Sequence, residues 1–526
     1  MNYKLFTFCF LHFFVFLTVF SQSDYKIELK DPELLEPISY ATVRFLGTNR
    51  GLIADVDGQF RLPNTILEEI KTLEVSSIGF TTIFIELKSL ELNKLNVYMM
   101  TPSIITLDEV VLKSSKSERK SILEKTKKLK AHEIVSRAVN SIKFHLDDEP
   151  HSYIGYYRDY QIFDNTYYNL NEGIIEQFDK GISTHPIINN ANQSALYSFD
   201  RNNNFATNLE SEKAYDNKNK RIPEAKIFSF GGNELSILNV HNAIRNYNNN
   251  SFSFVHKMDI DFLKNHEFFK GKVVIVDDNP ILEISFINIK ELTSVSHSVS
   301  GFLRVSLKDF SIYSFKYTAF DSNKIEPVFN LQIEYQRINK KMYLNYITFN
   351  NRFLLLLEGN VFKESNVIYD AKHNRFEIRF NSFPKPETIK KRNFKIKYYG
   401  AKIDIRSVED IGSKTVFLNL YEFDKRLQDM KTTDMANLEL LIKKVKDIKG
   451  RLIYESSFIN AYQFREYFVQ EIFTNKNLDS ELVYMNKQMP LKQAGINELI
   501  DVGKYIINSP LQKKSNPNMH NHIKRF

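Results

Sequence analysis

A short pattern at His132-Glu133 contains the residue types of a catalytic zinc site. In the helical zinc-protease motif, a second His follows the first after four residues, so that both imidazoles lie on one helical face. Ser136 occupies that position in this chain. Because one His alone cannot chelate zinc, we expect His132 to be a surface residue.

A pair of acidic residues, Asp55 and Asp57, precedes Gly58 and could suggest a calcium loop. Such a loop needs further oxygen ligands, usually including a bidentate Glu at its far end. No Glu stands at that offset here. Asp-Gly is also a strong hairpin-turn sequence, because Gly tolerates positive φ and Asp bonds to the nearby backbone. We therefore predict a hairpin turn.

Other patterns that could carry chemistry have simpler explanations as turns or strand ends. Gly231-Gly232 is predicted to be a turn, and so are the acidic pairs Asp147-Asp148 and Asp277-Asp278, which stand beside turn formers. Gly271-Lys272 lacks the glycine that would open a phosphate-binding loop, so we predict that it starts a strand. His520 and His522 lie in a polar tail. The chain has no Gly-x-Ser-x-Gly sequence for a serine hydrolase. We identify no catalytic, cofactor-binding or metal-binding residue and expect a protein that is not an enzyme and has no cofactor.

Tyrosines are concentrated in one stretch, at positions 153, 156, 157, 160, 167 and 168. Tyr combines a flat apolar face with a polar tip, which suits sugar stacking or a protein interface. The alternative is a strand with one buried face and solvated hydroxyl groups, and we favour it because Tyr is a good strand former.

The whole composition indicates a large β-rich globular protein. The 526 residues exceed one ordinary core, and Phe 43 and Tyr 27 with Trp 0 favour pleated sheets. The net charge of +8 is small for this length and lies in Lys-rich turns along the chain. Nucleic-acid binding is therefore not expected, whereas a mild attraction to anionic lipid headgroups is permitted.

The amino terminus predicts export. Lys4 precedes an apolar run from Leu5 to Phe20, and Val19-Phe20-Ser21 provides a cleavage site before Gln22. The run is shorter than the roughly 20 residues of a comfortable membrane span, so we predict a cleaved signal peptide over 1–21. Cys9, the single cysteine, lies inside it, and the processed chain would have no thiol.

Residues 22–112 show short alternating strands separated by Gly, Asp-Gly and Pro, which is typical of a small β-sandwich. Four signatures follow one another: Gly47-Thr48 with Gly51, then Asp55-x-Asp57-Gly58-x-Phe60-x-Leu62, then Ser77-Ile78-Gly79-Phe80, and finally Leu107-x-Glu109-Val110-Val111. In this order they resemble the carboxypeptidase regulatory-like domain of Gram-negative envelope proteins, over roughly a sixth of the chain.

That resemblance implies a transthyretin-like sandwich without catalytic activity, located in the cell envelope. The same module opens many TonB-dependent outer-membrane receptors, but no plug-like segment follows Val111, so we do not expect a receptor of that kind. The amphipathic stretch 131–145, followed by the Tyr-rich strand, also resembles the companion region found after this module in many envelope proteins.

The remaining chain predicts a linker over 113–130, a helix plus a large antiparallel β domain over 131–475, and a C-terminal tail over 476–526. Alternating stretches such as 303–307, 313–319, 331–335 and 376–380 supply strands with one wet face. Asp434 to Lys449 is predicted to be a capped helix. The fold class is therefore mainly β with some α, a sandwich followed by a larger antiparallel sheet.

Our leading interpretation is an exported, non-catalytic protein of the periplasm or outer membrane that acts in binding or assembly. Its partners would be other envelope proteins or a glycan or lipid ligand, with peripheral outer-membrane association permitted. A first alternative is a periplasmic carrier that holds a lipid or glycan in the curved sheet, which requires a deep apolar cavity. A second is an envelope-polymer hydrolase, which requires two carboxylates converging in a cleft with shifted pKa values.

Overall fold

The structure is a computed structural model. It describes residues 24–105, 121–122, 124, 126–186, 190–216, 218–222, 233–250, 257–276, 279–289, 297–321, 327–421, 427 and 437–510. The predicted signal peptide, most of the predicted linker, and His520 and His522 lie outside these ranges. The chain divides into two compact units: unit 1 comprises 1–214, 227–352 and 462–526, and unit 2 comprises 215–226 and 353–461.

The amino-terminal part of unit 1 is a sandwich of two small sheets. One sheet has the order β4-β1-β7, with β1 Asp24–Lys30, β4 Gln59–Pro63 and β7 Leu95–Met99. The other has the order β3-β2-β5-β6, with β2 Thr42–Phe45, β3 Gly51–Ile53, β5 Thr72–Ser76 and β6 Ile83–Glu86. Two short 3₁₀ helices, η1 Asn64–Glu68 and η2 Leu87–Ser89, connect strands. Alternate side chains from both sheets form one apolar core, as the sequence predicted.

The turn at Asp57-Gly58 exists, but the predicted hairpin is wrong. Asp55 accepts hydrogen bonds at Oδ1 from the backbone N–H groups of Asp57 (2.9 Å) and Gln59 (2.8 Å), and Gly58 has φ +70°. The strands on either side, β3 and β4, belong to different sheets. The turn therefore carries the chain across the sandwich, which local turn chemistry alone cannot distinguish from a hairpin.

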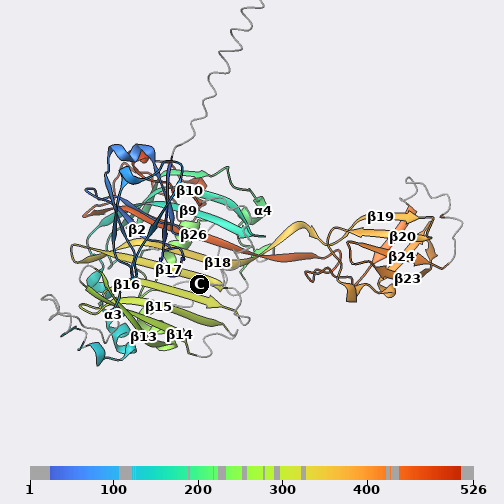
Figure 1. Cartoon of the computed structure of the whole chain (residues 1–526), viewed down its shortest axis with the longest axis horizontal. Coiled ribbons are helices and arrows are strands. Elements are labelled where there is room, and N and C mark those ends of the chain that lie inside the picture. The colour runs from blue at the N-terminus through green and yellow to red at the C-terminus, as the bar shows by residue number, and fades with distance from the viewer. Residues whose placement is uncertain are drawn as a thin grey trace, which may run out of the picture. The chain divides into compact units, whose positions relative to one another are not determined.

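The main body of unit 1 is a twelve-stranded sheet, whose strands are seen edge to edge in Figure 1. Its order is β11-β10-β9-β26-β18-β17-β16-β15-β14-β13-β8. The twelfth strand, β12, belongs to unit 2 and pairs with the part of β18 that belongs to unit 2. The bounds are β8 Ile104–Ile105, β9 His151–Phe163, β10 Thr166–Asp179, β11 Gln193–Arg201, β12 Lys220–Arg221, β13 His266–Val276, β14 Asn279–Asn288, β15 Ser298–Ser306, β16 Ile312–Phe320, β17 Pro327–Ile338, β18 Lys341–Val361 and β26 Ser456–Thr474.

Most predicted strands of this sheet are confirmed, including the hairpin of β13 and β14, in which Val276 pairs with Asn279. One detail differs. Gly271-Lys272 does not start a strand but lies inside β13, where the register to β14 shifts between Lys270 and Val273. The shift is a β-bulge, which a glycine accommodates easily.

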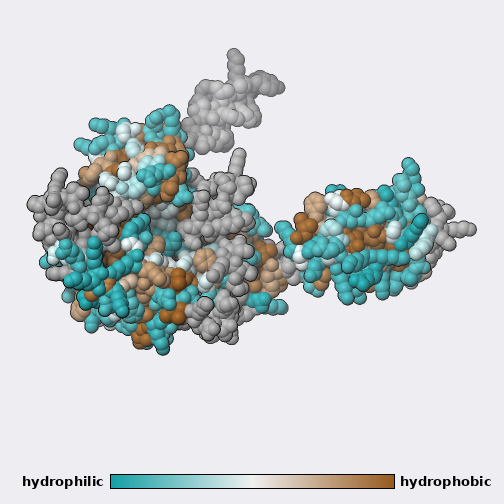
Figure 2. Space-filling model, turned by 60° about the horizontal axis from the view of Figure 1, so that its bottom comes forward, coloured by the Kyte–Doolittle hydropathy of each residue, from teal (hydrophilic) through white to brown (hydrophobic). Residues whose placement is uncertain are grey.

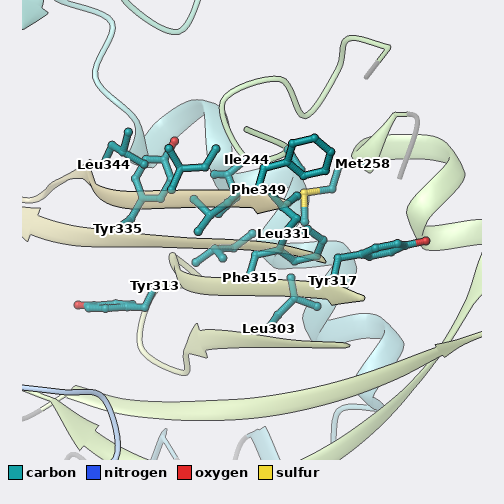
Figure 3. Packing of buried hydrophobic residues seen from close by; sticks show 14 of the residues in the cluster. Ile244, Met258, Leu303, Tyr313, Phe315, Tyr317, Leu331, Tyr335, Leu344 and Phe349 are labelled. Atoms are coloured by element: carbon teal, nitrogen blue, oxygen red, sulfur yellow. The ribbon is translucent and has the colours of Figure 1, made fainter. Parts of the chain in front are cut away.

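One face of the large sheet is covered by helices. They are α3 Ala131–His145, α5 Glu234–Val240, the π-helical turn η3 Met258–Phe262 and the short α6 Leu263–Asn265; α4 Leu209–Glu212 lies elsewhere in unit 1. The predicted amphipathic helix is confirmed, since its apolar residues Ile134, Val135, Ala138, Val139 and Ile142 are buried. Figure 3 shows side chains of this core, such as Phe315, Leu331 and Phe349, packed together. This face is therefore filled by side chains.

The opposite face of the sheet packs against the sandwich around Tyr40. Its ring lies 5.2 Å from that of Tyr346 and 6.2 Å from that of Phe468, measured between centroids. Both faces of β9 are consequently buried, and the prediction of solvated tyrosine hydroxyls is wrong. Tyr156 donates to Glu172 over 2.7 Å and Tyr157 to Asp159 over 3.1 Å instead.

Unit 2 is a separate compact body with its own apolar core, so the prediction of one β domain over 131–475 is wrong. Its sheets have the orders β19-β20-β24-β23 and β22-β21-β25. The bounds are β19 Glu364–Asp370, β20 Arg375–Phe380, β21 Phe394–Tyr398, β22 Ala401–Ile403, β23 Ile405–Asp410, β24 Thr415–Leu420 and β25 Leu438–Ile442, with 3₁₀ helices η4 Pro386–Thr388 and η5 Lys391–Asn393.

The predicted helix over 434–449 is also wrong, because 438–442 form β25 and pair with β21. Over so short a length, the spacing of the leucines fits both the period of a helix and that of a strand. Pairing with the available strand β21 decides in favour of a strand.

The C-terminal segment 476–510, which belongs to the predicted tail, is packed on the rest of unit 1. The backbone N–H of Asn497 donates to the Leu196 carbonyl over 2.7 Å, and that of Met485 donates to Ser194 over 2.9 Å. Gln470 on β26 holds Ile506 by two hydrogen bonds, of 2.6 and 2.9 Å. The short helices η7 Leu491–Gln493 and η8 Val502–Lys504 lie in this segment. It covers part of the sheet, which its polar composition did not indicate. Among the helices that the structure describes, none is long and apolar enough to span a bilayer.

Candidate functional site

A groove runs between the sandwich and the large sheet within unit 1. The sandwich wall consists of β2, β5 and the turn after β5; the sheet wall consists of the ends of β13, β16, β17 and β18. The lining side chains are mainly hydroxyl, amide and charged groups: Thr42, Arg44, Glu74, Ser76, Ser77, Thr81, Thr82, Ser103, Tyr313, Glu334, Tyr335, Gln336, Arg337 and Asn345, with Ile78, Phe80, Ile275 and Val276.

The turn that contributes to the sandwich wall contains the Ser77-Ile78-Gly79-Phe80 signature. Gly79 has φ +102°, a conformation that side-chain-bearing residues rarely adopt. Its carbonyl accepts a hydrogen bond of 2.8 Å from the N–H of Ser103, the residue directly before β8, and so holds the turn beside the start of that strand. Because β8 pairs with Val273 and Val274 of β13, the sandwich is joined to the large sheet at this end of the groove.

Two β-bulges shape the sheet wall. The β15–β16 register shifts so that Tyr313 has no partner opposite, and the β17–β18 register shifts in the same way at Asn345. A bulge bends its strand and re-aims the extra side chain, and bulges are frequent beside functional sites. Here both bulged residues lie in the groove lining.

Asn345 connects the two walls. Its Nδ2 donates to Thr42 Oγ1 of the sandwich over 2.8 Å and to Glu334 Oε1 of the sheet over 3.0 Å. Its Oδ1 accepts from Gln336 Nε2 over 3.2 Å. A second contact between the walls is the hydrogen bond from Arg44 Nη2 to Gln336 Oε1, of 3.1 Å. The groove is thus a built, hydrogen-bonded junction.

Glu334 is a carboxyl group of the groove with an altered acidity. Burial raises its pKa from 4.5 to about 7, opposed by the Asn345 hydrogen bond and the positive charge of Arg304. The strand register explains the influence of Arg304, since Arg304, Ser314 and Glu334 lie in one row across β15, β16 and β17. Glu334 can therefore accept or donate a hydrogen bond near neutral pH.

The space in the groove is considerable. Its volume of about 260 Å³ is many times the roughly 10–15 Å³ that a single water needs. Sites between domains are common places for ligands. The described lining contains no His or Cys and no nucleophile paired with a base, so its chemistry suits binding by hydrogen bonds.

A second, smaller pocket lies on the helix-covered face, next to Tyr335. It offers about 80 Å³ and its lining includes five amide side chains, Gln177, Asn192, Gln193, Asn239 and Asn242. Arg245 beside it is held by Asp179, with Nε–Oδ2 of 2.6 Å and Nη2–Oδ1 of 2.8 Å. Several of these amides bond to one another or to the backbone, as in the 2.7 Å bond between Asn239 and Gln177. We regard the larger groove as the candidate site.

The residues considered in the sequence analysis lie outside the groove. Asp55 serves the turn described above, and burial raises its pKa to about 6. His132 is exposed on α3, and its Nε2 lies 3.2 Å from the Leu263 carbonyl oxygen. Asp147 accepts from the Tyr343 hydroxyl over 2.5 Å, and Asp148 accepts from the N–H of Ser183. Gly231-Gly232 and Asp277-Asp278 lie outside the described residues.

Two carboxylates do approach each other in unit 1, at Asp159 and Glu234. Burial and the charge of Glu234 raise the pKa of Asp159 to about 7. Arg465 donates from Nε to Glu234, and its positive charge opposes the rise in the pKa of Asp159. Each oxygen of Asp159 already accepts a hydrogen bond, from Asn171 and from Tyr157, both of 3.1 Å. This arrangement is a buried ion network and does not offer the open cleft that a hydrolase needs. No group of three His, Cys, Asp or Glu side chains in the described ranges is arranged to hold a metal ion.

Sequence reasoning missed the groove residues for identifiable reasons. Gln332, Glu334 and Gln336 were expected on a solvated face, whereas Glu334 and Gln336 lie half-buried below the sandwich. The alternation of apolar and polar residues in β17 correctly showed which side chains share a face of the sheet. It did not show that the sandwich covers the polar face. The bulge at Asn345 has no signature in its local sequence, Leu344-Asn345-Tyr346.

Comparisons with known proteins bear mainly on the sandwich. The family model of the CarboxypepD_reg-like domain matches residues 28–112. A comparison with curated proteins gives no significant match. Two solved structures show a weak likeness. One is a DUF1329 family protein from Desulfovibrio piger, with 9% sequence identity and a TM-score of 0.19. The other is described as an outer membrane lipoprotein-sorting protein domain from Vibrio parahaemolyticus, with 7% sequence identity and a TM-score of 0.19. Each match covers 42% of this chain and 85% of the other.

The residues matched by the family model include most of the two small sheets. They also include β2, β5 and the signature turn, which line one side of the groove. Residues 28–112 of this chain are a CarboxypepD_reg-like domain.

Proposed function

We propose that the protein is exported and acts without catalysis in the cell envelope, where the groove between its CarboxypepD_reg-like domain and the large sheet binds a glycan. The observation that carries this proposal is the lining, in which hydroxyls, amides and the half-buried Glu334 converge on about 260 Å³ of space. Sugars present hydroxyl and acetamido groups, which such side chains can bind directly or through water. The amino-terminal sequence supports export, as argued above.

The absence of catalysis is part of the proposal. The groove holds two carboxylates on opposite walls, Glu74 on β5 and Glu334 on β17. A glycosidase also uses two carboxylates, as acid and base, so a test for released sugar is the direct check on this part of the proposal. The carrier alternative has less support, because the helix-covered face is filled by the side chains of the core and its pocket offers only about 80 Å³.

The experiment uses the lack of tryptophan in the chain. Thr82 is exposed and lines the groove, so Thr82→Trp places the single tryptophan of the chain at the rim, where its fluorescence can be excited apart from that of the tyrosines. Thr65→Trp, at an exposed position in η1 of the same domain, is the matched control. Each variant is titrated with tri-N-acetylchitotriose, maltotriose and trialanine.

We expect a saturable change in fluorescence with at least one of the two sugars in Thr82→Trp and none in Thr65→Trp. A response to trialanine alone would indicate a peptide site and would contradict the glycan assignment. No response to any probe, or equal responses in both variants, would contradict the groove as the site. Release of reducing sugar during the titration would contradict the non-catalytic part of the proposal.

A further inference from the structure

The net charge of the chain is concentrated in unit 2. Counted over its residues, unit 2 contains 25 Lys and Arg against 17 Asp and Glu, a net charge of +8, which equals the +8 of the whole chain. Unit 1 is accordingly neutral in sum. The sequence alone could not reveal this, because the boundaries of unit 2 were not recognised. A small domain with this charge will attract anionic surfaces.

Within unit 2, exposed apolar and basic side chains occur together where segments 383–385 and 446–448 pair. The N–H of Ile448 donates to the Phe383 carbonyl over 3.0 Å, and that of Lys385 donates to the Lys446 carbonyl over 2.7 Å. Phe383 is 45% exposed and Ile448 61% exposed. Two large apolar side chains thus lie next to each other in solvent.

Lysines surround these two side chains. Lys414 Nζ lies 5.5 Å from the centroid of the Phe383 ring, and Lys446 and Lys449 flank Ile448 in an exposed turn. We call Phe383, Lys414, Lys446, Ile448 and Lys449 the Phe383–Ile448 patch. None of its three ammonium groups forms an ion pair with another of the described residues.

The acidic residues near the patch are already neutralised. Asp447 is fully buried and forms an ion pair with Arg451, with Nη2–Oδ2 of 2.7 Å. Glu387 is paired with Lys385 over 3.0 Å. The patch therefore presents positive charge around an apolar centre. Figure 2 shows hydrophobic and hydrophilic surface side by side on this unit.

We propose that unit 2 docks on the surface of an anionic lipid bilayer through the Phe383–Ile448 patch. Anionic headgroups complement the lysines, and the apolar side chains enter the headgroup region, as in other peripheral membrane proteins. A nucleic acid would also attract the lysines, but an exposed aliphatic side chain such as Ile448 gains little from a phosphate backbone. The combination favours a lipid surface.

The test measures cosedimentation of the chain from Gln22 to Phe526 with vesicles, since an apolar leader could itself insert. Vesicles of phosphatidylcholine are compared with vesicles containing roughly one-third phosphatidylglycerol. Lys446→Glu with Lys449→Glu reverses two charges of the patch. Lys71→Glu with Lys88→Glu, at exposed positions of the sandwich, makes the same change in net charge elsewhere. Phe383→Ser with Ile448→Ser removes the apolar centre.

We expect binding to the phosphatidylglycerol vesicles only, which weakens with salt. Each basic residue near such a surface strengthens binding about fivefold, so the patch reversal should weaken it at least about 20-fold. The sandwich variant should bind nearly as well as wild type, and the serine variant should lose the binding that persists at high salt. The circular dichroism spectrum of each variant confirms folding.

Equal losses in the patch and sandwich variants would overturn the assignment to the patch. Failure of wild type to bind phosphatidylglycerol vesicles would overturn the proposal, and so would binding of a DNA oligonucleotide in preference to vesicles. These outcomes do not depend on the groove in unit 1, because none of the substituted positions lines it.

Discussion

The side-chain nitrogen of Asn345 lies 3.0 Å from Oε1 of Glu334, and this contact exists because a β-bulge turns Asn345 out of its strand register. The same nitrogen also reaches Thr42 of the CarboxypepD_reg-like domain. One amide therefore links the domain to the large sheet and holds the carboxylate of the groove.

Replacing Asn345 by Ala should destabilise unit 1. Asn345 is 2% exposed, and its loss removes one donor from the Glu334 carboxylate and the partner of the Thr42 hydroxyl. We expect a loss of about 1–3 kcal/mol in the free energy of unfolding, measured by urea denaturation. Asn203→Ala, at an exposed position in unit 1, should change it by less than about 0.5 kcal/mol. Equal effects would show that Asn345 is not a structural link.

Glu334 should make stability depend on pH in a defined window. Its pKa is raised from 4.5 to about 7 in the folded protein, so the folded state binds the proton more tightly than the unfolded chain. The contribution of Glu334 to stability therefore falls as pH rises from about 4.5 to about 7 and is constant above. Because Asp55 and Asp159 also have raised pKa values, the measurement compares wild type with Glu334→Gln.

The difference between these two proteins should change by about 1–3 kcal/mol across that window, with the variant less sensitive to pH. Parallel stability curves from pH 4 to pH 8 would contradict the raised pKa of Glu334.

The pattern of the chain predicted the kinds of elements better than their assembly. The alternation in β15, β16 and β17 and the apolar face of α3 are local signals, and the structure confirms them. Residues 353–461 alternate in the same way, so nothing local separates unit 2 from the large sheet. Likewise, the Asp57-Gly58 turn is a local feature, but which sheet receives the next strand depends on distant pairing.

Arg158 and Glu466 form a buried ion pair on neighbouring strands, with Arg158 1% and Glu466 2% exposed. Arg158→Met would leave the Glu466 carboxylate buried without its partner, and we expect a loss of about 3–5 kcal/mol in stability. Arg158→Met combined with Glu466→Leu removes both charges and should recover a large part of this loss. If the double variant were as unstable as the single one, the pair itself would not be the cause. Urea denaturation of both variants decides the question.

Gly155 on β9 allows the Tyr467 ring to lie across the strand. A Cβ atom at this position would come within 2.6 Å of the Phe468 carbonyl and 2.7 Å of the Tyr467 ring. Tyr467 bonds through its hydroxyl to the carbonyls of Tyr153 (2.9 Å) and Ile175 (3.0 Å), so it has little freedom to move.

We therefore expect Gly155→Ala to cost about 1–3 kcal/mol, measured as the shift in the thermal midpoint. In Gly495→Ala, the new Cβ atom meets only the Val483 side chain, which can shift. This second variant should have little effect, and a comparable shift in both would argue against the clash.

The candidate site was harder to predict than the fold, for a physical reason. Glu334 and Gln336 are ordinary polar residues of an alternating strand, and they become distinctive only because the sandwich covers them. The signature Ser77-Ile78-Gly79-Phe80 was visible in the sequence, but its position against β13 was not. Which element covers a strand, and in which register two strands pair, depend on residues far apart in the sequence, so a local sequence pattern cannot predict them.

The most direct test of the groove as a binding site is the exchange of protons on ligand binding. Calorimetric titration of wild type and Glu334→Gln with the responding sugar, near pH 7 in buffers of different ionisation enthalpy, gives the number of protons exchanged. Because the pKa of Glu334 lies near 7, a ligand in contact with it should cause exchange in wild type and none in Glu334→Gln. Equal exchange in both proteins, or none in either, would contradict a ligand site at Glu334.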